Sequence, residues 1–167
     1  MNIHVTYGDV TELKAIKESL TDQQLVLMEL GNEAVLIQEN EGSAGFAEAD
    51  SYTVLDASGE IVNGNYAVFN NIPVTTEGRE IFEQRFMGRA RRIEDTEGFS
   101  AIRVLRPLES DTYVILTKWK DEASFKAWQN SQEYADAHQK RGTEEGIDQK
   151  PNIFSRPSFV TTYLKVD

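Results

Sequence analysis

The first third of the chain alternates between short apolar and short polar runs. Runs with a period of two, or continuous apolar runs, are typical of strands and occupy residues 2–7, 25–30, 34–38 and 52–55. Between the first two of these, apolar residues recur at helical spacing behind Asp9 or Thr11, either of which can cap a helix. Gly31-Asn32 suits a tight hairpin turn, because both residue types tolerate a positive φ. The segment therefore predicts the order β-α-β-β, with a further short strand at its end.

A loop-forming run, Asn63-Gly64-Asn65, follows this segment, and beyond it the same order of elements recurs in longer form. Strand patterns occupy residues 66–72, 99–105, 112–119 and 159–166, and helical patterns occupy residues 77–93 and the stretch after residue 119. Thr75 or Thr76 can cap the first helix, which has four apolar side chains on one face: Phe82, Phe86, Ala90 and Ile93. The order β-α-β-β-α-β is that of a ferredoxin-like α+β domain. We expect an N-terminal β-α-β-β extension at residues 1–65, packed on the sheet of a ferredoxin-like domain at residues 66–167.

The composition narrows the possible partners. Of the 167 residues, 40% are apolar and 27% are charged, which is ordinary for a globular protein. The net charge of −11 argues against nucleic acid and anionic membrane surfaces, because both are bound through clustered Lys and Arg. The chain has no cysteine, which excludes disulfides, thiolate catalysis and iron–sulfur ligation. No run approaches the roughly 20 apolar residues that span a bilayer, so we expect a cytoplasmic protein without a membrane partner.

Several short motifs of the second part follow one another in a fixed order. The first strand and helix contain Phe69-Asn70-Asn71-Ile72-Pro73-Val74-Thr75 and Phe82-Glu83-Gln84-Arg85-Phe86, and Gly98-Phe99 opens the next strand. Four residues then fit the pattern W-x(5)-F-x-x-W-x(9)-H: Trp119, Phe125, Trp128 and His138. In this order and spacing, residues 66–167 resemble the antibiotic biosynthesis monooxygenase (ABM) superfamily of dimeric α/β-barrels, and within it the Isd-type haem-degrading enzymes. With its extension, the chain resembles the longer Hmo-type haem monooxygenases of Gram-positive bacteria.

This resemblance implies an activity and three site residues. The activity is oxidative degradation of haem, which is both substrate and cofactor; the reaction uses molecular oxygen and an external electron donor, and releases iron with a bilin-like product. Asn70 matches the family's asparagine, which donates a hydrogen bond on the oxygen side of the haem. Trp128 matches the tryptophan that presses on the porphyrin, and His138 matches the axial ligand of the haem iron.

His138 and Trp128 each have a simpler interpretation as well. A neutral imidazole suits haem iron, whereas a lone histidine on a polar helix is commonly a solvated surface residue. Trp128 is equally suited to packing on the sheet. On one continuous helix these two side chains would point about 80° apart, so a shared pocket requires a break. Asn130 and Glu133 form a capping pair that predicts such a break after Trp128.

The remaining parts of the expected site are an amide and a set of basic residues. An inward-facing Asn70 without a hydrogen-bond partner would lower the stability of the fold by about 1–3 kcal/mol, and a ligand pocket would supply the missing partner. Asn71 on the opposite face is expected to be only a polar strand end. The propionates of haem require Arg or Lys side chains. Five residues are candidates: Arg85, Arg89, Arg92, Lys140 and Arg141. We assign Arg85 and Arg89 to this role; the simpler interpretation of all five is a solvated helix face.

Two other functions stay open. The long form of the chain also resembles proteins known as target of RNAIII-activating protein, which implies a haem-binding or signalling protein without turnover. Other branches of the superfamily are cofactor-free monooxygenases that act on aromatic metabolites, and the spacing of Trp128 and His138 favours haem over them. The second histidine, His4, lies in the first predicted strand, outside the family-like part of the chain.

The extension predicts the oligomeric state. The short members of the family that this chain resembles are homodimers that pair sheet to sheet. In such a dimer each sheet has helices on one side only, and its other, apolar face is covered by the partner. The apolar strands of residues 1–65 are suited to cover that face, since exposed apolar area costs roughly 25 cal/mol per Å². We expect a monomer with internal pseudo-dimer packing and one haem site.

Overall fold

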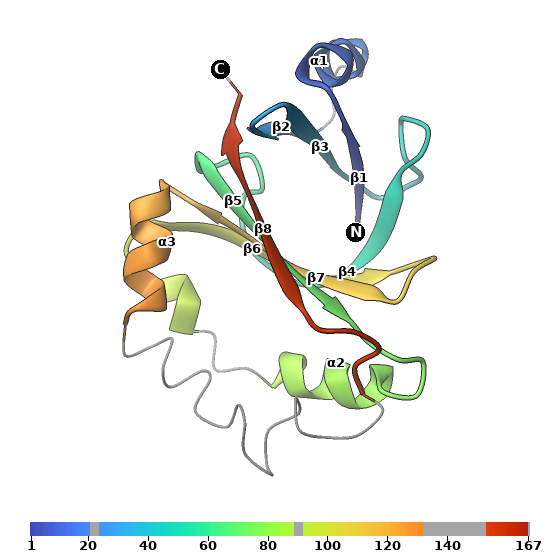
Figure 1. Cartoon of the computed structure of the whole chain (residues 1–167), viewed down its shortest axis with the longest axis vertical. Helices are drawn as coiled ribbons and strands as arrows, with labels where there is room; N and C mark the ends of the chain where they lie inside the picture. Colours follow the sequence, from blue (N-terminus) through green and yellow to red (C-terminus); the bar gives the residue numbers. More distant parts are fainter. Residues whose placement is uncertain (21–23, 89–91, 132–152, 167) are drawn as a thin grey trace.

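The computed structural model of the protein describes residues 1–20, 24–88, 92–131 and 153–166. Within these residues, eight strands form one closed barrel and three α-helices lie on its outside (Figure 1). In this described part of the chain, no helix is both long enough and apolar enough to cross a membrane.

The N-terminal half of the barrel follows the predicted order and has a longer last strand than expected. Its elements are β1 (Asn2–Gly8), α1 (Val10–Ser19), β2 (Gln24–Leu30), β3 (Glu33–Asn40) and β4 (Asp50–Gly59). Asp9 is the N-cap of α1 and accepts a hydrogen bond from the Glu12 amide at 2.8 Å. Gly31 has φ +60° in the turn between β2 and β3. The prediction for β4 was too short, because its second half has weak strand propensity and is a strand through pairing with β6.

The C-terminal half has the predicted order β-α-β-β-α-β, which confirms the ferredoxin-like arrangement. Its elements are β5 (Tyr66–Pro73), α2 (Arg79–Met87), the short 3-10 helix η1 (Arg92–Asp95), β6 (Phe99–Pro107), β7 (Thr112–Trp119), α3 (Glu122–Gln129) and β8 (Phe159–Lys165).

The helix predicted at residues 77–93 is shorter in the structure. α2 begins after Gly78, which has no capping side chain, and the Thr75 hydroxyl accepts a hydrogen bond from the Gly78 amide at 3.0 Å before the helix starts. α2 ends at Met87 because Gly88 follows and favours helix termination. Ala90, one of the four apolar side chains predicted for one face, lies outside the described residues. The other three pack against one cluster on the sheet: Phe82, Phe86 and Ile93.

The strand order around the barrel has a pseudo-twofold pattern. The N-terminal half contributes β4-β1-β3-β2 and the C-terminal half contributes β8-β5-β7-β6. The edges of the two halves meet where β2 pairs with β8 and β4 pairs with β6, both antiparallel. In this pattern β1, α1, β2, β3 and β4 correspond in order to β5, α2, β6, β7 and β8.

One hydrophobic core fills the inside of the barrel, and both halves contribute to it. Its N-terminal members include Ile3, Val5, Val26, Met28, Val35 and Ile37, and its C-terminal members include Ala67, Phe69, Leu105, Val114, Leu116 and Tyr163. The N-terminal strands therefore cover the inner face of the C-terminal sheet and also extend it edge to edge. Because the two halves share this core, a boundary at residue 65 stays a prediction.

Two cations are buried inside the barrel. Arg103 on β6 forms an ion pair with Glu39 on β3, with an N–O distance of 2.6 Å, and so joins the two halves. Lys118 on β7 is fully buried, and its Nζ donates to the Ile61 carbonyl at 3.0 Å. Burial, with a smaller contribution from the nearby charge of Lys165, lowers the pKa of Lys118 to about 8.

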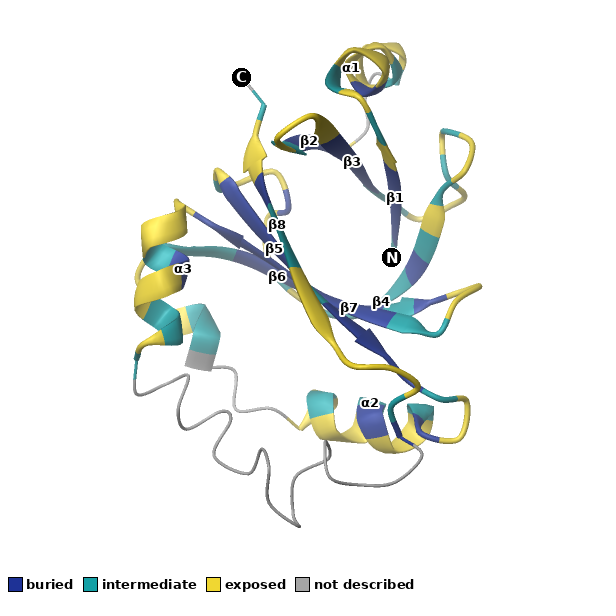
Figure 2. Cartoon of the chain, in the orientation of Figure 1, coloured by how far each residue is buried: buried dark blue, intermediate teal, exposed yellow. Residues whose placement is uncertain are grey.

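The helices cover the outside of the barrel unevenly (Figures 1 and 2). α1 covers the N-terminal half through Leu13, which packs with residues of β2 and β3. α2 and α3 cover separate parts of the outer face of the C-terminal half, and β8 is exposed at both of its ends.

Candidate functional site

The alternation of β5 directs Asn70 to the outer face of the C-terminal sheet. Ala67 and Phe69 belong to the core inside the barrel, whereas Val68 and Ile72 belong to clusters on the outside. Asn70 is half-buried on this outer face. Its direct neighbours across the sheet are Ile115 on β7 and Val160 on β8.

Two apolar clusters flank Asn70 along β5. The α3-side cluster consists of Tyr66, Val68, Trp119 and Phe125, with Trp128 packed against it. The α2-side cluster consists of Ile72, Val74, Phe82, Ile102, Val104, Tyr113 and Ile115. The half-buried Asn70 amide therefore lies between two buried apolar clusters.

α3 places Trp128 over the outer face of the sheet. The helix begins at the Asp121 N-cap, whose carboxylate accepts from the Ser124 amide at 2.8 Å. Phe125 and Trp128 are three residues apart and so share one helix face. The Trp128 ring lies 5.7 Å from the Trp119 ring and 6.3 Å from the Phe125 ring, measured between centroids. The structure thus supports the packing role of Trp128 and also brings this side chain to the face that carries Asn70.

The predicted end of the helix after Trp128 is confirmed. α3 ends at Gln129 with Asn130 as its C-cap. Whether a second helix then carries the histidine is not described, because His138 and Glu133 lie outside the described residues.

The predicted propionate ligands are only partly described. Arg85 is exposed on α2, one residue before Phe86, which packs on the α2-side cluster. Arg89 lies outside the described residues, as do Lys140 and Arg141. Arg92 begins η1. The structure therefore brings Asn70 and Trp128 to one face and locates Arg85 on a helix that covers the same face.

Asn71 is more than a polar strand end, which corrects the expectation for this residue. It is buried, and its Nδ2 donates to the Phe69 carbonyl at 3.1 Å and to the Phe159 carbonyl at 3.3 Å. Asn71 therefore links β5 to β8 from the inner face, opposite to Asn70.

A group of charged side chains attaches α2 to the sheet, and the sequence analysis did not anticipate it. Arg106 on β6 donates to both carboxylate oxygens of Glu83, at 3.0 Å from Nε and 2.6 Å from Nη2, and the Tyr113 hydroxyl also donates to Glu83. The hydrogen bond from Arg106 is the main reason that the pKa of Glu83 is lowered. Burial, reinforced by Glu83, raises the pKa of Tyr113 to about 12. Nothing local in the sequence signals this group, because its members lie on three separate elements.

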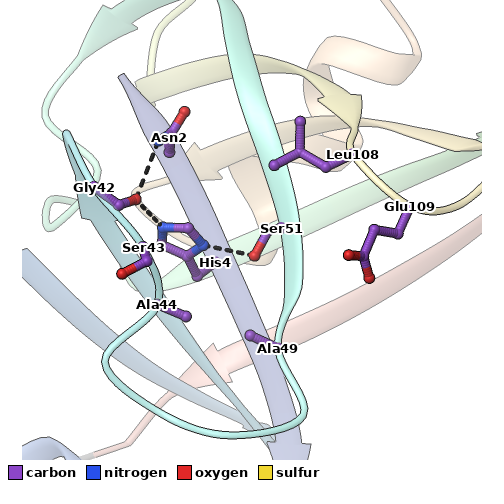
Figure 3. A pocket seen from close by; sticks show the side chains of 9 residues that line it. All are labelled: Asn2, His4, Gly42, Ser43, Ala44, Ala49, Ser51, Leu108 and Glu109. Carbon is purple, nitrogen blue, oxygen red and sulfur yellow. Dashed lines mark hydrogen bonds between the residues drawn. The ribbon is translucent and has the colours of Figure 1, made fainter.

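His4 lies in a different part of the molecule and has its own partners (Figure 3). It is 2% exposed on β1, beside a hollow of about 480 Å³. Its Nε2 lies 2.9 Å from the Gly42 carbonyl and 3.0 Å from Asn40 Oδ1, so this nitrogen carries a proton and donates. Its Nδ1 lies 2.7 Å from the Ser51 hydroxyl. Both ring nitrogens are therefore engaged within the protein, and none of the predicted site residues lines this hollow.

Comparison with known proteins finds a family similarity in the C-terminal half. Residues 65–140 match the model of the antibiotic biosynthesis monooxygenase family. The predicted resemblance to the ABM family is confirmed. The match includes Asn70, Trp128 and His138, the three residues assigned from the family pattern.

Two kinds of relative resemble the chain. Signal transduction protein TRAP of Staphylococcus epidermidis is 22% identical over 131 residues, which is 78% of each chain. The mycobilin-producing heme oxygenase of Mycobacterium tuberculosis is 34% identical over 62 residues, which is 36% of this chain and 59% of that protein. Both relatives fit the resemblances found in the motifs.

Solved structures resemble the whole fold of the chain and not only its C-terminal half. The structure of a major regulator of staphylococcal pathogenesis superposes with a TM-score of 0.85 at 20% identity, and covers 100% of both chains. LmHde, a heme-degrading enzyme from Listeria monocytogenes, superposes with a TM-score of 0.71 at 21% identity, and covers 99% of this chain and 100% of that one. At these identities the comparison concerns the fold alone.

Proposed function

We propose that the protein binds haem against the outer face of β5, between α2 and α3, and degrades it with molecular oxygen and electrons from an external donor. The observation that carries this proposal is the position of Asn70, a half-buried amide between two apolar clusters. A large apolar ring suits the clusters, and a polar group at its centre suits the amide. The heme oxygenase relative and the fold shared with LmHde add support.

The described residues fit a bound haem in two respects. The α3-side cluster supplies the partly exposed Trp128 ring, which is held by the buried rings of Trp119 and Phe125 at centroid distances of about 6 Å. The Asn70 side chain supplies a donor on an otherwise apolar face. When bound, haem supplies both the iron that activates oxygen and the ring that is opened.

The residues of the chain have separate proposed roles in this reaction. Asn70 Nδ2 donates a hydrogen bond to the oxygen substrate and so directs it. Trp128 contacts the face of the ring and keeps water from it. His138 is the proposed iron ligand, by the family pattern, and Arg85 and Arg89 are the proposed partners of the propionates. The cytoplasmic location and the external electron donor stay predictions.

A direct assay tests the proposal. Purified protein is titrated with ferric haem, and the complex is mixed with a reductant in air while the Soret band and free iron are followed. We expect stoichiometric binding, loss of the Soret band and release of iron. Failure of the protein to bind haem would contradict the proposal as a whole.

A second candidate is a haem-binding or signalling protein that does not turn haem over. The observation in its favour is coverage, since the TRAP relative matches 78% of this chain whereas the heme oxygenase relative matches 36%. The same assay separates the two candidates. A Soret band that persists through reduction in air, with no free iron, would favour the second one.

A further inference from the structure

The outer face of β8 carries an apolar strip that the described structure leaves open to water. Val160 is 55% exposed and Leu164 is 53% exposed, although both are large apolar side chains in a strand. With Thr162 between them, they alternate onto one side of β8. In Figure 2, β8 is exposed towards both of its ends, and its middle is intermediate or buried.

This strip continues the surface that carries Asn70. In the pairing of β5 with β8, Val160 lies opposite Asn70, Thr162 opposite Val68, and Leu164 opposite Tyr66. Directly opposed residues of an antiparallel pair have side chains on the same face of the sheet. Val160 and Leu164 therefore lie beside Asn70 and the α3-side cluster.

The N-terminal half offers a comparison for Val160, because no ligand is expected at the corresponding residue of its own strand. β4 corresponds to β8, and its second residue, Ser51, pairs with His4 as Val160 pairs with Asn70. Ser51 is polar and its hydroxyl is hydrogen bonded to the His4 ring. The counterpart on β8 is an apolar side chain in water, which is unfavourable unless another apolar group covers it.

We propose that Val160 and Leu164 form one wall of the haem site, with Val160 in contact with the porphyrin next to Asn70. This inference rests on the function proposed above, and haem is the occupant because the strip is continuous with the surface around Asn70. Val160 and Leu164 are four positions apart along the strand, which is about 13 Å, a span suited to the edge of a large flat ring. The apolar contact adds to the affinity for the ring, whereas Asn70 acts on the reaction of the ring with oxygen.

The test measures ferric haem affinity by Soret titration of the full chain. Val160→Asp and Leu164→Asp are each expected to weaken binding at least tenfold, because a carboxylate replaces an apolar contact. Val160→Leu, which keeps the contact apolar, should bind within about twofold of the parent. Leu108→Asp is the matched control, because Leu108 is also 55% exposed but lies at the hollow beside His4, and it should leave affinity unchanged.

Two outcomes overturn the inference, and they are distinguishable. If the parent and Asn70→Ala proteins bind haem but Val160→Asp binds as tightly as the parent, the β8 wall is wrong while the proposed function stands. If the parent does not bind haem at all, the proposed function fails and the inference fails with it. Far-ultraviolet circular dichroism checks folding, and Val160→Thr, which has nearly the same shape, replaces Val160→Asp if that variant does not fold; several-fold weaker binding is then expected.

Discussion

The two histidines of the chain have different expected roles, and substitution separates them. His138→Ala should weaken haem binding or change the Soret spectrum, because the family pattern assigns it to the iron. His4→Ala should leave the spectrum unchanged and lower the free energy of unfolding by about 1–3 kcal/mol, because Ser51, Gly42 and Asn40 each lose a hydrogen bond to the ring. Haem titration and urea denaturation measure the two effects. An unaltered spectrum and affinity in His138→Ala would refute its assignment as ligand.

The neighbouring asparagines of β5 allow a matched comparison of catalysis with stability. Asn70→Ala should still bind haem but degrade it roughly 100- to 1,000-fold more slowly, since the loss of one donor of this kind typically costs about 3–4 kcal/mol of barrier. Asn71→Ala should instead lower stability by about 1 kcal/mol, because Asn71 bonds backbone carbonyls on the inner face. The rate of haem degradation is measured in a single turnover with preloaded haem, and a parental rate in Asn70→Ala would show that the proposed role is wrong.

At the scale of elements, the contact between α2 and the sheet depends on Glu83 and Arg106. A double-mutant cycle with Glu83→Gln and Arg106→Gln should give a coupling energy of about 1 kcal/mol, reduced from the value of a buried pair because Arg106 is partly exposed. Urea denaturation measures it, and the exposed pair Asp111–Arg156 is the control, for which we expect a coupling near zero.

The pH dependence of the same pair follows from the lowered pKa of Glu83. Because the folded carboxyl has a lower pKa than the unfolded one, its stabilisation is present above the ordinary value of 4.5 and is lost as pH falls through the folded pKa. The coupling energy should therefore disappear in acid. A coupling that is unchanged at low pH would show that the contact is not an ion pair.

At the scale of the whole molecule, the burial of Lys118 in the barrel makes the free energy of unfolding depend on pH. The pKa of Lys118 falls from 10.5 to about 8 on folding, so the unfolded chain binds more protons between these values and stability rises with pH. Between pH 8 and 10 this contribution amounts to about 2 kcal/mol. Lys118→Met should remove it from the measured dependence of unfolding free energy on pH, whereas Lys120→Met, at an exposed neighbour, should not. Equal pH dependence in all three proteins would contradict the assignment.

Closure of the barrel within one chain also predicts the oligomeric state. The inner face of the C-terminal sheet is covered by the N-terminal strands, and both sheet edges are paired within the chain. Among the described strands, the inner face and the edges of the C-terminal sheet are thus completed without a second subunit, so we expect a monomer with one haem site. Light scattering at micromolar concentration measures the mass, and a stable dimer joined through the C-terminal sheets would contradict this expectation.

Features that depend on neighbours in the chain could be predicted from the sequence. The Asp9 cap, the turn at Gly31 and the end of α3 after Trp128 each arise from a few consecutive residues. The period of two in β5 likewise determines that Asn70 and Asn71 face opposite sides. The family pattern then added roles to Asn70, Trp128 and His138 that local patterns do not contain.

Features that depend on pairing between distant segments were decided only by the tertiary structure. The length of β4, the buried pair of Arg103 and Glu39, and the contact of Glu83 with Arg106 all require a strand or helix from elsewhere in the chain. The position of Val160 beside Asn70 joins residues 90 apart in the sequence. Periodicity indicates which face of a strand is apolar, but not which strand lies next to it, because strand neighbours are chosen by the closure of the whole sheet.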